Sequence, residues 1–192
     1  MSITKLTSNG LTGSKYDTVS ADNYYMEPIA TQLVGVGGVS SIIFNNIPQG
    51  YKHLQVRLNA RGTSANIFIT TGFRLNGDTG SNYSNHRLVG TGNAMYSQAS
   101  INDTQAYFTA SSAASGAANC FSASIADFLD YSNVYKFKTV KVLSGAHDGT
   151  NDEIQMRSTV WMNTAPITSM TLFLASGNIA QYSIASLYGI KG

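Results

Sequence analysis

Hydrophobic and polar residues alternate strictly along 51–61, YKHLQVRLNAR, and this stretch has the clearest pattern in the chain. Its apolar positions are Leu54, Val56, Leu58 and Ala60, and the positions between them are His53, Gln55, Arg57 and Asn59. Successive side chains of a strand point to opposite faces, so the pattern predicts a half-buried strand of an antiparallel sheet. No segment of the chain has a clear helical period.

Similar strand patterns recur over most of the chain, which indicates ten or eleven strands. Gly37-Gly38 separates the first two, and a Gly-Gly pair between β-rich runs predicts a hairpin because both residues can take positive φ. The segment 90–116 has the weakest pattern, and its small-residue run 111–118 is expected to be a flexible surface loop. Besides 51–61, the expected strands are 29–36, 39–47, 67–76, 83–90, 104–109, 119–129, 136–145, 153–162, 167–174 and 181–190.

The number and spacing of these strands predict an all-β fold, an antiparallel two-sheet β-sandwich of jelly-roll type. An up-and-down barrel is the alternative. With 192 residues, of which 43% are hydrophobic, the chain is long enough for one domain with a substantial core. We therefore expect one sandwich domain over residues 28–192.

The first 27 residues are expected to form an extended N-terminal arm. Residues 2–23 have few apolar side chains and no sustained period, so they cannot bury enough surface to order themselves as a unit. We expect the arm to lie on a neighbouring chain or on its own sandwich. The candidate contact residues are Leu6, Leu11, Tyr16, Val19, Tyr24 and Tyr25.

The charge of the chain argues against a nucleic-acid partner. The formal net charge is +2, and charged residues make up 11% of the sequence. Nucleic-acid proteins usually carry a clustered basic face. Lys136, Lys138 and Lys141 are instead expected on a solvated sheet face or an edge strand. A β protein so sparsely charged and rich in Gly, Ser and Thr is typical of extracellular and virion components.

Features of export, membrane insertion and disulfide formation are also missing from the sequence. The residues after Met1 are polar, without the apolar core of a signal peptide, and no run approaches the ~20 apolar residues of a membrane helix. Cys120 is the only cysteine, so an intramolecular disulfide is excluded, and we expect it to be a small buried hydrophobe. The chain is expected to be made and folded in a cytoplasm.

Candidate catalytic and metal-binding residues are few. The three histidines are far apart and form no zinc pattern. The segment 147–153 could offer oxygen ligands to calcium but lacks the EF-hand spacing, so a solvated hairpin loop is the preferred interpretation. Asp127 and Asp130 could serve as glycosidase carboxylates, although a turn-capping role is favoured. No nucleophile elbow, Walker loop or dinucleotide fingerprint is present. We predict a protein that is not an enzyme and has no cofactor.

One residue pair is a candidate for contact with a partner. In 153–162, Trp161 shares a strand face with Arg157 and Thr159, whereas the other face carries Ile154, Met156, Ser158 and Val160. Because a tryptophan on a partly polar face is typical of an interface, we expect Arg157 and Trp161 to contact a partner or another subunit.

Four segments resemble a family of structural proteins from tailed bacteriophages of aquatic bacteria. They are IPQGYKHLQVRLNAR, FRLNGDTGSNYSNHRL, ASIADFLDYSNVYKFKTVKVLSG and RSTVWMNTAPITSMTLFLASGNIAQYSIASLYGIKG. The closing SLYGIKG and the segment NGDTGSNYSNHRL are the most specific, and SNGLTGSKYD is similar to the leader of such proteins. The resemblance covers nearly the whole chain. It implies a structural or host-contact role and supplies no catalytic residues.

The expected function is that of a virion protein, made in the host cytoplasm, that decorates or cements a phage capsid. Its partners would be the major capsid protein, docked through the N-terminal arm, and copies of itself, as a trimer by analogy with other virion jelly rolls. The alternative is a tail-fibre or tail-adaptor module that binds host surface glycan through 76–86, 91–103 and 147–152. A glycan-degrading enzyme that uses Asp127 or Asp130 is the least favoured hypothesis.

Overall fold

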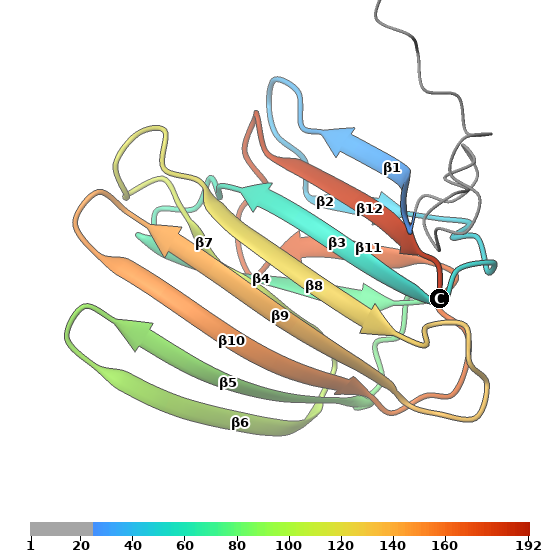
Figure 1. Ribbon diagram of the computed structural model, residues 1–192. Helices are drawn as coiled ribbons and strands as arrows, with labels where there is room; N and C mark the ends of the chain where they lie inside the picture. The colour runs from blue at the N-terminus through green and yellow to red at the C-terminus, as the bar shows by residue number, and fades with distance from the viewer. Residues whose placement is uncertain (1–24) are drawn as a thin grey trace, which may run out of the picture.

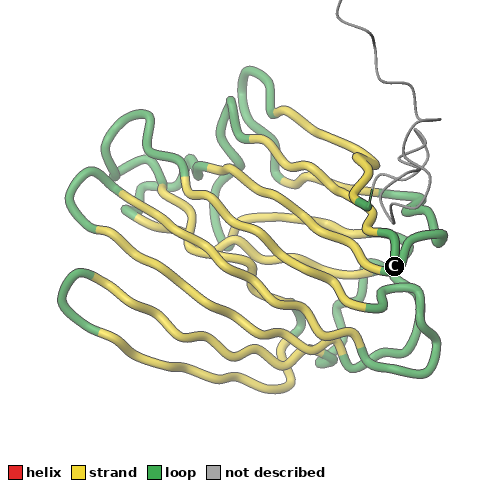
Figure 2. The backbone as a smooth tube through the Cα atoms, in the orientation of Figure 1, coloured by secondary structure: helices red, strands yellow, loops and turns green. Residues whose placement is uncertain are grey.

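The computed structural model describes residues 25–192, and they form two antiparallel β-sheets that pack face to face (Figure 1). None of these residues is helical, as Figure 2 shows. The predicted all-β, two-sheet sandwich is therefore confirmed. The barrel alternative is wrong, because the strands divide between two separate sheets.

The sheets are unequal in size. The eight strands of the large sheet are, in spatial order, β1 (Met26–Leu33), β12 (Ile184–Ile190), β3 (His53–Ala60), β8 (Ser122–Leu129), β9 (Lys138–His147), β10 (Asp152–Trp161), β5 (Tyr83–Thr91) and β6 (Met95–Asp103). The four strands of the small sheet are β2 (Ser41–Phe44), β11 (Met170–Leu174), β4 (Phe68–Leu75) and β7 (Ala106–Ser112).

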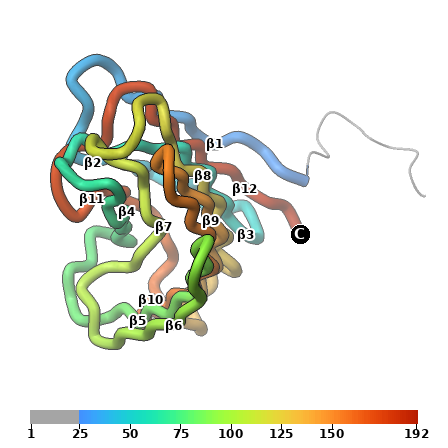
Figure 3. Tube along the Cα trace, turned by 90° about the vertical axis from the view of Figure 1, so that its left-hand side faces the viewer, coloured from blue at the N-terminus to red at the C-terminus, as the bar shows by residue number. Residues whose placement is uncertain are grey.

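Strands that follow one another in the chain mostly alternate between the two sheets. β1, β12, β3 and β8 are neighbours in the large sheet, and β2, β11, β4 and β7 make up the small one. The hairpins β5–β6 and β9–β10 add four strands to one side of the large sheet. β5 and β6 reach beyond the small sheet (Figure 3). The jelly-roll assignment and the extended arm remain predictions.

The core lies between the sheets and begins with the strand that the sequence shows most clearly. In β3 the residues Leu54, Val56 and Leu58 are buried, as their alternation predicts. Phe73 of the small sheet packs edge-on against Phe128 of the large sheet, with ring centroids 5.5 Å apart. Interlocked aromatic side chains of this kind fix the two sheets face to face.

The first predicted hairpin is wrong. β1 and β2 belong to different sheets, where β1 pairs with β12 and β2 pairs with β11. Gly37 and Gly38 do take positive φ, 89° and 72°, but their turn carries the chain from one sheet to the other. The strand also begins at Met26, inside the predicted arm. Pro28 is tolerated there because β1 is an edge strand and its register shifts between Pro28 and Ala30.

The segment 90–116 holds more structure than its sequence indicates. β6 was missed, and β7 extends further than expected. Ser111, Ser112 and Ala113, which were assigned to a surface loop, are fully buried. Thr71 and Ser111 share a hydrogen bond of 2.6 Å in the interior, which offsets the cost of burying their hydroxyl groups.

Candidate functional site

A row of exposed apolar side chains crosses the outer face of the large sheet. Ile125 of β8, Leu143 of β9, Met156 of β10 and Leu88 of β5 are direct neighbours in the strand register. Their exposed fractions are 42%, 52%, 62% and 45%, respectively. Because neighbouring strands lie about 4.8 Å apart, these four side chains form one continuous strip about 15 Å long. We call them the apolar row.

The apolar surface continues toward the β9–β10 turn. Ile154 is 59% exposed and stands between two glycines, Gly145 on β9 and Gly90 on β5. Ala123 lies beyond Gly145, and Met95, 75% exposed, lies beyond Gly90. Because these two glycines have no side chains, the Ile154 side chain projects beyond its neighbours on both adjacent strands. A raised apolar side chain among glycines can insert into a facing surface.

On its other side the apolar row is bordered by polar residues. Asp127, Lys141, Ser158 and His86 are register neighbours across the same four strands. Asp127 and Lys141 thus carry opposite charges side by side. An exposed apolar strip with a polar rim is the usual anatomy of a protein–protein contact.

The structure contradicts the prediction that Arg157 and Trp161 contact a partner. Arg157 is 5% exposed and Trp161 is 1% exposed, because both point toward the small sheet. The apolar positions of β10 point outward instead. The polar side chains at the inner positions are only partly satisfied: Nε2 of Gln155 and Nη2 of Arg157 are buried without a partner, whereas other groups hydrogen-bond to neighbouring strands. Thr159, for example, donates a hydrogen bond to Oδ1 of Asn85 at 2.8 Å. Alternation on a single strand shows two faces but does not show which of them is covered.

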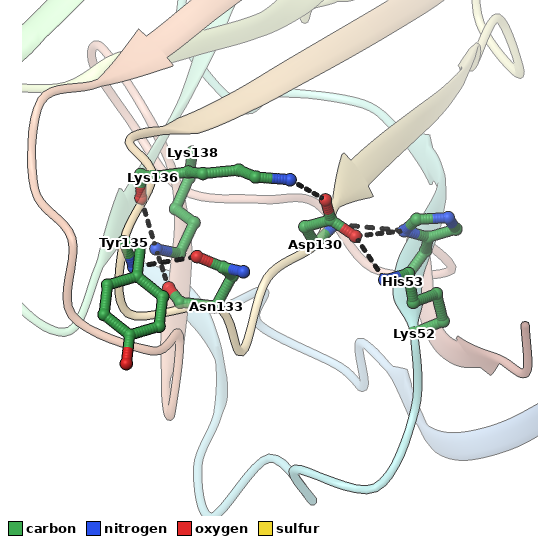
Figure 4. A network of polar contacts seen from close by, with 7 residues as sticks. All are labelled: Lys52, His53, Asp130, Asn133, Tyr135, Lys136 and Lys138. Atoms are coloured by element: carbon green, nitrogen blue, oxygen red, sulfur yellow. Dashed lines mark hydrogen bonds and ion pairs between the residues drawn. The ribbon is translucent and has the colours of Figure 1, made fainter.

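Asp130 is the centre of a charged cluster near the end of β8 (Figure 4). Nζ of Lys136 lies 2.8 Å from one carboxylate oxygen, and Nζ of Lys52 lies 3.1 Å from the other. Hydrogen bonds from Lys136 and Lys52 lower the pKa of Asp130 to about 2. The backbone amide of Asp130 donates a hydrogen bond to Nδ1 of His53 at 3.0 Å. The cluster ties the start of β3 to the β8–β9 loop.

Lys138 is buried, not solvated as the sequence suggested, and β9 is an inner strand. Its ammonium group donates to the carbonyl oxygens of Asn133, Lys136 and Thr164 at 2.6, 2.8 and 3.0 Å. Burial lowers the pKa of this lysine. Lys136 and Lys141 are exposed, as expected.

The loop 148–151 joins β9 to β10, as the hairpin interpretation predicts. The Asp148 carboxylate accepts hydrogen bonds from the amides of Thr150 and Asn151 and from the Asn151 side chain. These bonds lower its pKa. Within 25–192 no group of three His, Cys, Asp or Glu side chains is placed to hold a metal ion.

Most of the candidate arm contacts, namely Leu6, Leu11, Tyr16, Val19 and Tyr24, lie outside the described residues. Tyr25 is described, and its side chain is 81% exposed. Its carbonyl oxygen accepts a hydrogen bond from the backbone amide of Lys191 at 3.0 Å. The start of the described chain is therefore joined to the strand end after β12.

Comparisons with known proteins give no match to a family model, a curated protein or a solved structure. In the part of the chain that the structure describes, no helix is long and apolar enough to cross a membrane. The resemblance to phage structural proteins therefore rests on the sequence segments alone.

Proposed function

We propose that this protein is a structural component of a tailed-phage virion that assembles by pairing the outer faces of two large sheets. The apolar row is the observation that carries the pairing of the two faces. Four large apolar side chains on four adjacent strands remain 42–62% exposed to water. Burying such a strip between two subunits releases ordered water and supplies the main driving force of association.

A second copy of the chain is the partner that fits this face best. Asp127 and Lys141 are adjacent along the polar border. A two-fold axis that lies between the two faces, parallel to β8 and β9 and midway between them, would set Asp127 of one copy against Lys141 of the other and Ile125 against Leu143. An eight-stranded sheet is roughly 35 Å wide and its strands are about 30 Å long, which exceeds the ~800 Å² per partner of a standard interface.

The virion role is supported by composition, strand order and the sequence resemblance. The strand orders β1-β12-β3-β8 and β2-β11-β4-β7, with consecutive strands in opposite sheets, fit the jelly-roll topology common in viral capsid proteins. Docking on the capsid would use the N-terminal arm.

The alternative is a tail module that binds host glycan. A trimer, expected by analogy, would need a contact other than the two-fold pairing of sheet faces.

Gold labelling of intact phage particles tests the virion role. The exposed turn 92–94 between β5 and β6 is a better epitope than 111–118, whose first three residues are buried. We expect label over the head, with pre-immune serum as the control. Label confined to the tail would move the protein to the glycan-binding alternative, and particles without label would contradict a virion role.

Removal of residues 1–24 tests the docking step. The core described above lies within 25–192, so we expect the shortened chain to keep the circular dichroism spectrum of a β protein. We also expect it to lose binding to capsids that lack the native protein. Binding at full strength by a folded, shortened chain would contradict docking through the arm.

A further inference from the structure

A polar cleft lies between β7 and the inner face of β10, β5 and β6, where the large sheet extends past the small one. Its volume is about 380 Å³. The residues that matter for its chemistry are Arg87, Arg157, Asn85, Gln98, Asp103 and Tyr107. We call it the arginine cleft. A space of this size matches the smaller ligand pockets of proteins.

Two guanidinium groups face this cleft from neighbouring strands. Arg157 and Arg87 are directly opposite each other in the β10–β5 register. Among residues 25–192, neither has a carboxylate within the 4.0 Å of an ion pair. The repulsion by Arg87 affects Arg157 more than the attraction by Glu153 does, and a bound anion would reduce that repulsion.

Arg157 is held in place by a hydrogen bond and still has a donor group without a partner. Its side chain is 95% buried, and its Nε donates to Oε1 of Gln155 at 2.7 Å. Its Nη2 is buried and makes no hydrogen bond. Burial, together with the charge of Arg87, lowers the pKa of Arg157 to about 10, so it is still charged at neutral pH. A buried charged donor without a partner is costly unless a ligand satisfies it.

The other groups in the cleft are an aromatic ring and hydrogen-bonding side chains. The Tyr107 ring centroid is 5.9 Å from the guanidinium carbon of Arg157. Gln98 accepts a hydrogen bond from Arg87, and its amide nitrogen is a further donor. The Asp103 carboxylate already accepts from Asn85 at 2.6 Å and from Ser100, so these hydrogen bonds hold it in place.

We propose that the arginine cleft binds the anionic group of an acidic sugar, with Arg87 and Arg157 on the anion and the amide nitrogen of Gln98 on a hydroxyl group. Paired guanidinium groups match the geometry of carboxylate, sulfate or phosphate oxygens. A free inorganic anion would occupy a small part of 380 Å³, whereas a monosaccharide fills much more of it. This site is separate from the outer face and does not depend on a virion location.

The test is titration calorimetry of the full chain with D-glucuronate, D-glucose and inorganic sulfate. We expect glucuronate to bind at least tenfold more tightly than glucose or sulfate. Arg87→Gln, a change at a partly exposed residue, should weaken glucuronate binding at least tenfold. Lys141→Gln removes an equal charge from the outer face and should leave binding unchanged.

Two results would overturn the proposal. One is glucuronate binding no tighter than glucose or sulfate, or absent. The other is equal loss of binding in Arg87→Gln and Lys141→Gln, which would indicate attraction by overall charge. Glu153 provides a second variant, because its partly buried carboxylate is close enough to both arginines to interact with their charges and has one buried oxygen without a partner. Glu153→Gln should tighten glucuronate binding several-fold, and weaker binding would contradict an anion site.

Discussion

The indole Nε1 of Trp161 donates a hydrogen bond to Oδ2 of Asp78 at 2.7 Å, although 83 residues separate the two. This contact joins the end of β10 to the turn after β4. Burial alone would raise the pKa of Asp78, but hydrogen bonds from Trp161, Asn82 and Gly80 outweigh it and lower the pKa. Trp161, which was expected at an interface, is instead buried and joins the two sheets through this hydrogen bond.

Replacing Asp78 should destabilise the fold. Asp78→Ala leaves the buried indole N–H without an acceptor and frees the turn, so we expect a loss of about 2–3 kcal/mol in the free energy of unfolding. Trp161 is the only tryptophan, so its fluorescence in a urea titration reports the transition directly. Asp78→Asn keeps one acceptor oxygen and should lose less. Unchanged unfolding midpoints in Asp78→Ala would show that the contact contributes nothing.

Asp130 should make the folded state sensitive to acid. Its pKa is about 2 in the folded chain against an ordinary value of 3.8. Ionised Asp130 therefore favours folding at pH values above 3.8, and this contribution is lost as the pH falls toward 2. Asp130→Asn removes the charge, and asparagine tolerates the φ of 48° at this position.

Urea unfolding of the two proteins from pH 6 to pH 2 measures this effect. We expect the wild-type protein to be more stable than Asp130→Asn by a constant margin above about pH 5, and the margin to shrink as Asp130 becomes protonated. Free energies of unfolding that differ by the same amount at every pH would contradict this role of the Asp130 cluster.

Lys138 and Lys141 should differ sharply, although both are lysines of β9. Lys138→Met deprives three carbonyl groups of their donor, and we expect a loss of about 3 kcal/mol in the free energy of unfolding. Lys141→Met changes an exposed residue and should cost less than about 0.5 kcal/mol. Thermal unfolding of both variants at neutral pH compares them. Equal losses would mean that the buried ammonium group is not a structural element.

The elements that the sequence predicted well are those with a local signal. The alternation in β3 depends on residues close in sequence. The elements that it missed depend on distant partners. β1 pairs with β12 from the other end of the chain, and Gly37-Gly38 cannot specify that choice.

The candidate sites show the same limit. Arg157 and Arg87 are 70 residues apart, and only the β10–β5 register brings them to one cleft. Of the apolar row, the sequence showed that Met156 shares a face of its strand with Ile154, but not that this face is exposed, because strand patterns do not show which face is covered. A strand with apolar residues on one face and polar residues on the other can bury either face.

Sedimentation velocity of the wild-type protein beside Leu143→Lys tests the central claim, self-association through the apolar row. Leu143→Lys places a charge in the middle of the row, while Thr139→Lys places one on the same strand and face but outside the row. At micromolar concentration we expect wild type and Thr139→Lys to sediment as dimers, with twice the 20.5 kDa mass of one chain, and Leu143→Lys to sediment as a monomer. A wild-type protein that stays monomeric at about 100 μM, or a Leu143→Lys variant that assembles like wild type, would contradict it.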